Sequence, residues 1–113
     1  MSDFEVLNGY RSMWLFCFFD LPVVKKADQK KAAKFRKQIM EDGFTMHQFS
    51  VYLRHCGSKE SAIIHQIRVM GFVPDKGRVS LLSVTDKQYK DIKNIWGRSM
   101  EPVKKIPQQL EFF

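Results

Sequence analysis

The sequence contains few cysteines and no long hydrophobic segment. Only two cysteines occur among 113 residues, too few for the disulfide scaffold of a small secreted protein, so we predict a reducing compartment and give a Cys17–Cys56 bridge little weight. No stretch reaches the roughly 18 apolar residues that a membrane-spanning helix requires. The acidic amino terminus also lacks the form of a signal peptide. We therefore expect a cytoplasmic protein without a membrane partner.

Acidic residues are scarce relative to basic ones. The chain has 12 Asp and Glu against 19 Lys and Arg, which gives a formal net charge of +7. An excess of this size favours an acidic partner, above all nucleic acid, and disfavours a small-molecule regulatory domain. The length suits a single domain with a small core. We predict a domain over residues 1–97 and a carboxyl-terminal tail over residues 98–113.

The most apolar stretch runs from Met13 to Phe19 and ends abruptly at Asp20. Its seven uncharged residues, four of them aromatic, predict a strand that is covered on both faces, or nearly so. Pro22 has no amide proton and disfavours helix at the residue before it, so it ends the strand. Asp20 is then either a strand-end residue that hydrogen-bonds the next turn or a metal ligand. The residues alone leave both interpretations open.

After Pro22 the apolar residues follow the period of a helix. Ala32, Phe35 and Ile39 predict an amphipathic helix from about Asp28 to Asp42, closed by Gly43. Lysine rows on helices are often only solvated surface, but few acids oppose these cations, which favours contacts with phosphates. The predicted nucleic-acid-binding residues are Lys25, Lys26, Lys30, Lys31, Lys34, Arg36 and Lys37.

The stretch from Phe44 to His55 is rich in aromatic and β-branched residues. It predicts one bent strand or two short ones. Alternation along this stretch assigns Phe49, Val51 and Leu53 to a core face and Tyr52 to a polar face.

A second helix, a strand and a short helix complete the predicted domain. Ser58 is a good N-cap for a helix that ends at Gly71, and residues 78–84 predict a strand. Thr85 or Asp86 would then cap a short helical segment that stops at Gly97. The second helix has an apolar stripe of four residues: Ile63, Ile64, Ile67 and Met70.

The order of these elements is strand, helix, strand or strand pair, helix, strand. It is that of an α+β sandwich of the ferredoxin-like type, with both helices on one face of an antiparallel sheet. This fold hosts many functions, so the fold by itself identifies none of them.

Specific residues along this order resemble the CRISPR-associated protein 2 family. They are the apolar strand that ends in Asp20, the basic helix closed by Gly43, and Gln-Phe-Ser-Val-Tyr at 48–52, which matches the family's Gln-x-Ser-Val-aromatic signature. The match covers about Met13 to Val84 and looks most like prokaryotic members from type II systems. The resemblance implies a homodimer that bridges two dimers of the CRISPR integrase during spacer acquisition. It also implies that a prespacer duplex lies across the basic surface of this homodimer.

The resemblance leaves the catalytic activity open. Some family members are described as magnesium-dependent nucleases of RNA or duplex DNA, in which the strand-end Asp, here Asp20, faces its symmetry mate across one Mg²⁺. One Asp is a poor site for a cation that needs several oxygen ligands, so a two-fold axis would have to supply the second carboxylate. One metal is also less than the two-metal arrangement typical of efficient phosphodiester cleavage. We therefore favour a scaffold over an enzyme.

Two alternatives have weaker support in the sequence. Sheet aromatics on this fold can stack bases in RNA-recognition modules, but the chain has no Lys/Arg-Gly-aromatic-Gly-Phe signature, so a core role for these aromatics is simpler. Zinc binding is disfavoured because the spacing of the candidate ligands matches none of the usual patterns. These candidates are His47, His55, Cys56 and His65.

The tail ends with three apolar residues, Leu110, Phe112 and Phe113, after two prolines. They are either a frayed end or an edge strand that pairs with the integrase or with the sister protomer. We predict that they dock a partner.

Overall fold

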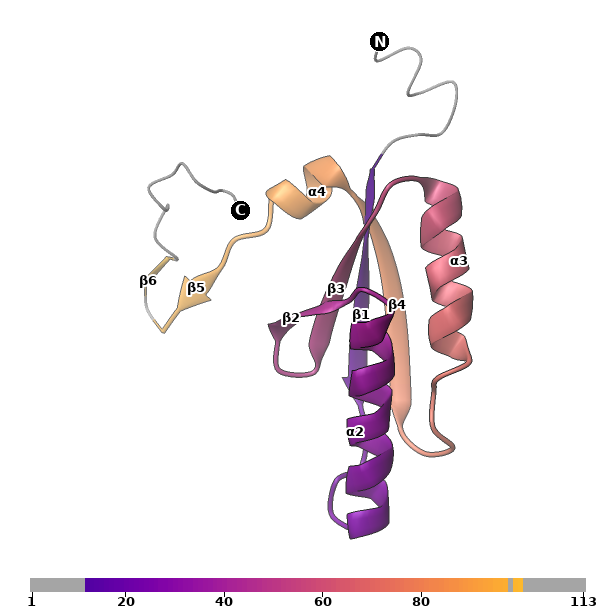
Figure 1. The fold of residues 1–113 in the computed structure, drawn as a ribbon. Coiled ribbons are helices and arrows are strands. Elements are labelled where there is room, and N and C mark those ends of the chain that lie inside the picture. Colours follow the sequence, from indigo (N-terminus) through magenta and orange to yellow (C-terminus); the bar gives the residue numbers. More distant parts are fainter. Residues whose placement is uncertain (1–11, 98, 101–113) are drawn as a thin grey trace.

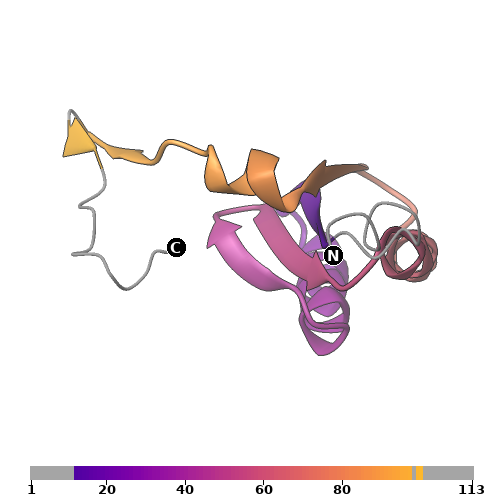
Figure 2. The same ribbon diagram turned by 90° about the horizontal axis from the view of Figure 1, so that it is seen from above.

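Figure 1 shows the computed structural model of the chain, which describes residues 12–97 and 99–100. Four strands form one antiparallel sheet in the order β2-β3-β1-β4. They are β1 (Met13–Asp20), β2 (Thr45–Gln48), β3 (Val51–Cys56) and β4 (Arg78–Thr85). Two helices, α2 (Lys26–Glu41) and α3 (Lys59–Met70), cover one face of this sheet (Figure 2). The predicted α+β ferredoxin-like order is confirmed.

A short arm follows the sheet. It consists of helix α4 (Asp86–Lys90) and the two-stranded hairpin of β5 (Ile95–Trp96) and β6 (Ser99–Met100). Figure 1 shows this arm leading away from the four-stranded sheet. Among the described residues, no helix has the length and apolar character needed to cross a membrane.

Strand β1 lies at the centre of the sheet and pairs with β3 on one side and β4 on the other. Leu15, Cys17 and Phe19 are buried in a cluster with side chains from both helices. Met13 packs against the same cluster. Because side chains alternate along a strand, every second residue from Trp14 onward lies on the opposite face, which we call the open face: Trp14, Phe16, Phe18 and Asp20. Burial on both faces is therefore only partly confirmed, since Phe16 is buried but Phe18 is 38% exposed.

Strands β2 and β3 are two short strands joined by a turn at Phe49 and Ser50. The predicted alternation holds within β3, and Leu53 is buried as predicted, but the assignments of Phe49 to the core and of Tyr52 to a polar face are wrong. Phe49 lies in the turn and is 87% exposed, whereas Tyr52 is buried with the helix-side core. Tyr52 pairs with Cys17, so it shares the helix-covered face, and Leu53 lies on the open face beside Phe16. Both faces of β3 are therefore packed, and the error comes from treating the turn residue Phe49 as part of the core and the side of Tyr52 as polar.

The end of α2 is held by a buried carboxylate. Asp42 caps the helix, and its side chain accepts a hydrogen bond from Arg68 Nε at 2.5 Å and lies 2.7 Å from His65 Nδ1. Both partners belong to α3, so Asp42 joins the two helices. The Asp42 carbonyl accepts a bond from Arg54 Nε at 2.7 Å. A Cβ at Gly43 would lie 2.7 Å from that nitrogen, and the φ of +103° also requires glycine at this predicted helix end.

Helix α3 begins as predicted, because Ser58 accepts a hydrogen bond from the Ser61 amide at 3.0 Å. The predicted core stripe is wrong, however. Ala62 and Val69 are the buried residues of α3, and the bonds from His65 and Arg68 to Asp42 fix the same rotation. The stripe is consequently turned toward solvent, and each of its members is at least half exposed: Ile63, Ile64, Ile67 and Met70.

Helix α4 is shorter than predicted. Thr85 and Gln88 form a reciprocal capping box at its start, as expected for a Thr85 N-cap. The helix ends at Lys90 instead of continuing to Gly97, and Ile95 lies in β5. Beyond Lys90 the amides make the short i→i−3 bonds of a helix end rather than further α-helical bonds.

Candidate nucleic-acid interface

Asp20 is the last residue of β1 and is exposed on the open face. Its partner in the register is Arg78, the first residue of β4. The turn before Arg78 packs tightly against this strand end. A Cβ at Gly77 would lie 2.9 Å from the Asp20 carbonyl oxygen and 2.7 Å from Leu21 Cδ2, and the φ of Gly77 is +97°. Glycine at position 77 therefore lets this turn lie against the end of β1, where Arg78 pairs with Asp20.

The surroundings of Asp20 do not provide a metal site within one chain. Among the described residues, no group of three or more His, Cys, Asp or Glu is arranged to hold a metal ion. The residue opposite Asp20 is the cation Arg78. Mg²⁺ requires several oxygen ligands, so a single carboxylate whose cross-strand partner is a cation does not fit it. Further ligands would have to come from a second molecule.

The four candidate zinc ligands lie in different environments. His65 contacts the Asp42 carboxylate, and His55 packs its ring edge-on against Trp14 with a centroid distance of 4.8 Å. His47 packs edge-on against Phe16 with a centroid distance of 6.0 Å.

The two cysteines are buried and free. Burial raises the pKa of the Cys17 thiol to about 12, and burial also raises the pKa of Cys56. Both thiols therefore stay protonated at neutral pH, and the thiol is much less reactive than the thiolate. Both side chains pack in the hydrophobic core, Cys17 from β1 and Cys56 from β3.

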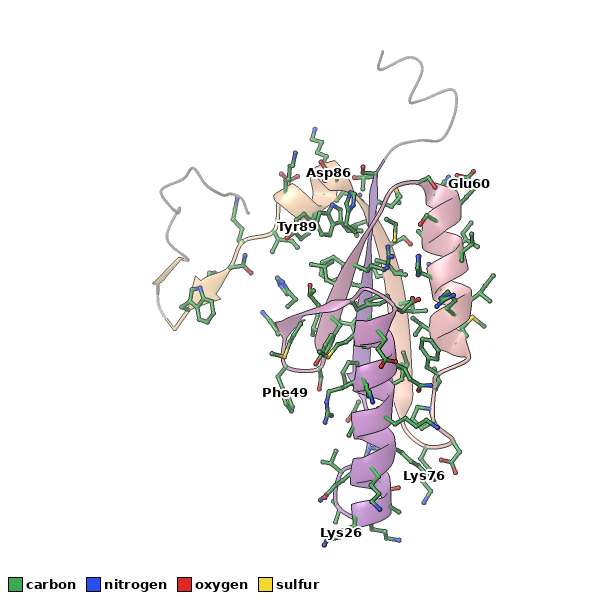
Figure 3. All side chains as sticks on the ribbon, viewed as in Figure 1. Lys26, Phe49, Glu60, Lys76, Asp86 and Tyr89 are labelled. Carbon is green, nitrogen blue, oxygen red and sulfur yellow. The ribbon has the colours of Figure 1, made fainter. Side chains whose placement is uncertain are left out.

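The exposed surface of α2 carries a row of lysines. Lys30, Lys34 and Lys37 are spaced by four and three residues, so they lie along one side of the helix, and all three are exposed. The opposite side of α2 is buried through Ala32, Phe35 and Ile39. Lys25 and Lys26 are exposed where α2 begins. Figure 3 shows Lys26 at the same end of the molecule as Lys76.

Two of the predicted cations lie apart from this row. Lys31 forms an exposed ion pair with Asp75 at 2.9 Å. The hydrogen bond to Asp75 and its negative charge raise the pKa of Lys31, and the same hydrogen bond and the positive charge of Lys31 lower the pKa of Asp75. The positive charge of Lys31 is therefore partly compensated. Arg36 is half-buried and lines a groove beside Phe49. The seven cations thus form one row with two residues on its flanks, instead of one continuous patch.

The structure adds two cations that the sequence analysis did not select. Lys76 and Arg78 flank Gly77 and are both exposed, but Arg78 pairs with Asp20 and so belongs to the open face, not to the side of the lysine row. Both residues could have been noticed in the sequence, because they lie at the predicted turn of Asp75–Gly77. The position of this turn relative to α2 and β1, however, could not be predicted from the sequence.

A clamp of aromatic residues fixes the start of the arm on the open face. Trp14 Nε1 donates a hydrogen bond to Asp86 Oδ1 at 2.8 Å. The Trp14 ring stacks on Tyr89 with a centroid distance of 3.9 Å and an interplanar angle of 15°. Figure 3 shows Asp86 and Tyr89 together on α4. Trp14 and Asp86 are 72 positions apart, which is why sequence reasoning missed the contact. The tail residues Leu110, Phe112 and Phe113 lie outside the described residues.

Comparisons with known proteins agree on one family. The family model for CRISPR associated protein Cas2 matches residues 13–92. A relative from Flavobacterium psychrophilum is 41% identical over 107 residues, which cover 95% of this chain and 93% of the relative. One from Parvibaculum lavamentivorans is 45% identical over 101 residues, which cover 89% of this chain and 100% of the relative. One from Paracidovorax avenae is 43% identical over 108 residues, which cover 96% of this chain and 100% of the relative. Each of the three is named CRISPR-associated endoribonuclease Cas2.

The clamp predicts a pH-dependent stability. The hydrogen bond from Trp14, and then that from Lys90, lowers the pKa of Asp86 from its usual 3.8. Asp86 therefore stabilises the folded state above the unfolded pKa, and this contribution is lost as the pH falls through the lower folded pKa. Trp14→Phe should cost about 1 kcal/mol or less at pH 7, since Asp86 is partly exposed. Below about pH 4 this cost should shrink.

Denaturant unfolding from pH 7 to pH 3 measures both parts of this prediction. Trp96→Phe is the matched control, because Trp96 is 65% exposed on β5 and should show no pH-dependent difference. A cost of Trp14→Phe that is the same at every pH would show that the carboxylate of Asp86 is not coupled to the clamp.

Proposed function

The chain belongs to the CRISPR-associated protein Cas2 family, and we propose that it acts as a dimeric duplex-DNA-binding scaffold in spacer acquisition. The observation that carries this proposal is the exposed lysine row of Lys30, Lys34 and Lys37 on α2 in a chain of net charge +7. Such cations bind phosphates and hold a duplex without reading its sequence. A scaffold requires this kind of contact.

The open face of the sheet is the proposed dimer interface. Phe18 is 38% exposed and Leu82 is 50% exposed on this face. Of the helices that the structure describes, only α4 lies on it, at one end. Closed two-fold dimers use the same surface of both partners, and an apolar sheet face is suited to such packing. Pairing through the open face leaves α2 of each protomer on the outside. DNA binding and dimerisation therefore do not compete for the same surface.

The CRISPR integrase is the proposed protein partner, with one integrase dimer at each side of the scaffold. The arm leads away from the sheet (Figure 1), so the tail at residues 98–113 continues from a segment that is not packed on the domain core. We propose that Leu110, Phe112 and Phe113 provide the docking contacts.

A magnesium-dependent nuclease is the second candidate function. Asp20 is exposed on the proposed dimer face, and this position favours the hypothesis because two-fold pairing would bring in a second Asp20. The relatives carry the name endoribonuclease, which gives this candidate further support. The described residues of one chain hold no group of three or more potential ligands, so this activity would depend on the dimer.

The proposed interface predicts that a charged side chain on the open face prevents dimerisation, whereas one on α3 does not. Leu82→Lys should convert a dimer into a monomer at micromolar concentration, because it would place two buried lysines in the interface. Ile67→Lys is the matched control, since Ile67 is 62% exposed on α3, away from the open face. Sedimentation velocity measures both variants. An unsubstituted protein that sediments as a monomer would contradict the proposed interface.

The lysine row predicts a loss of DNA affinity that is independent of sequence. Changing Lys30, Lys34 and Lys37 to Glu should weaken duplex binding equally for every sequence tested. The slope of log affinity against log salt should fall by about 2 to 3, because each phosphate contact contributes about 0.9. The control variant changes Lys59, Lys87 and Lys93 to Glu and alters the net charge by the same amount. Equal losses in the two variants would mean that net charge alone attracts DNA.

Asp20→Asn separates the scaffold from the nuclease. The variant keeps the size of the side chain but removes the charge that would hold a divalent ion. We expect a folded dimer that binds duplex, shows any magnesium-dependent cleavage at background level, and supports integration in the reconstituted complex at nearly the unmutated rate. Glu60→Gln, at an exposed site on α3 and therefore on the opposite side of the sheet, is the control. Loss of integration by a folded, DNA-binding Asp20→Asn dimer would overturn the scaffold proposal.

A further inference from the structure

The turn between β2 and β3 presents an aromatic side chain to solvent. Gln48 and Val51 are paired, so Phe49 and Ser50 form a two-residue turn, and Ser50 adopts the left-handed φ of +66°. The Ser50 carbonyl accepts a hydrogen bond from the Phe19 amide at 3.1 Å, which ties the turn to the central strand. Phe49 is nevertheless 87% exposed. Figure 3 shows it projecting from the tip of this hairpin.

Phe49 borders a groove between the hairpin and α2. This hairpin groove has a volume of about 590 Å³, within the range of about 300–1,000 Å³ that is typical of small-molecule sites. Its apolar lining includes Val23 and Met46, which are 53% and 62% exposed. Its polar lining comes from α2 through Gln29 and Arg36. The groove thus combines an exposed aromatic ring and apolar side chains with a guanidinium group.

The chemistry of this groove fits a nucleotide better than an apolar ligand. An exposed aromatic ring can stack on any nucleobase, and a guanidinium can pair with phosphate. The lysine row on the same helix makes the surrounding surface positive, which favours a polyanion. Inside a duplex both faces of each base are stacked on neighbouring pairs, so only the terminal base pair or an unpaired base can offer a face to Phe49. An unpaired base can also leave the helix axis and enter a groove, which a terminal base pair cannot do without opening.

A second copy of the chain on the open face would leave the main part of this groove uncovered. The groove is lined by Arg36 and Gln29 of α2 and by Tyr52, which faces the helices. It therefore opens on the helix side of the sheet. Phe49 also borders a second groove, beside Trp96 of the arm, so contact of Phe49 with a second copy must be one outcome of the test.

We propose that the hairpin groove binds one unpaired nucleotide of a DNA strand, with its base stacked on Phe49 and its phosphate beside Arg36. The inference rests on the proposed binding of DNA by α2 and extends it. The lysine row holds the duplex, and the hairpin groove receives a strand where base pairing ends.

The test compares two DNA probes by fluorescence anisotropy with the full chain. One is a blunt duplex, and the other is the same duplex with a five-thymidine single-stranded extension. The unsubstituted protein should bind the extended duplex about tenfold more tightly, a factor within the range for base–aromatic stacking. Phe49→Ala should abolish this preference, and Arg36→Gln should reduce it. Phe49→Trp should preserve it.

The matched control is Val24→Ala, because Val24 is 89% exposed but does not line the hairpin groove; it should leave the preference intact. Since the Phe49 side chain is almost fully exposed, Phe49→Ala should leave the melting temperature and the affinity for blunt duplex unchanged. Equal binding of both probes by the unsubstituted protein would overturn the proposal. So would a Phe49→Ala variant that loses affinity equally for both probes, or that dissociates into monomers.

A free oligothymidine separates this inference from the proposed function. If blunt duplex does not bind at all, the scaffold proposal fails, but the hairpin groove can still be tested on the single strand. Phe49→Ala must then weaken oligothymidine binding by about tenfold. Unchanged oligothymidine binding in this variant would overturn the hairpin groove alone, whatever the lysine variants do to the duplex.

Discussion

The pairing of β1 on both edges is the constraint on which the rest of the structure depends. With β3 on one side and β4 on the other, the strand can neither slip nor rotate without breaking two ladders, and a slip of one residue would exchange its two faces. The helix-covered face then receives Leu15, Cys17 and Phe19. The open face receives Trp14, which clamps the arm, and Asp20. The core, the arm and the candidate carboxylate therefore have positions set by one register.

The second constraint is the burial of Asp42 at the end of α2. A buried carboxylate is costly unless charged or polar groups pair with it, and α3 supplies His65 and Arg68 for this purpose. These contacts, together with the packing of Val69, fix the rotation of α3 about its own axis. The apolar residues Ile63 and Ile67 are exposed as a result. Electrostatic pairing and close packing of small side chains thus decide which face of α3 is buried, rather than the apolar content of the helix.

Local signals predicted the elements of the fold, and contacts distant in sequence produced the errors. The sequence located β1, the end of α2 at Gly43 and the Ser58 cap, because each depends on neighbouring residues. The burial of Tyr52 could not be predicted, since it depends on the pairing of Tyr52 with Cys17 of the central strand. The cation row was predictable from helical spacing, whereas the pairing of Lys31 with Asp75 required the fold. The role of Asp20 could not be predicted from one chain, because a metal site there needs ligands from a second molecule: the described residues hold no group of three or more potential ligands.

The positions of the lysine row and of Asp20 give a physical reason to favour a scaffold. The row lies on the outer side of α2, which covers one face of the sheet, while Asp20 belongs to the opposite, open face. A phosphate bound at Lys34 is therefore separated from the Asp20 carboxylate of the same chain by a helix and a sheet. If two open faces pair, each Asp20 also becomes enclosed between the protomers. A duplex held on the outer helices would then not reach either carboxylate, so cleavage would require a second mode of binding that the lysine row does not provide.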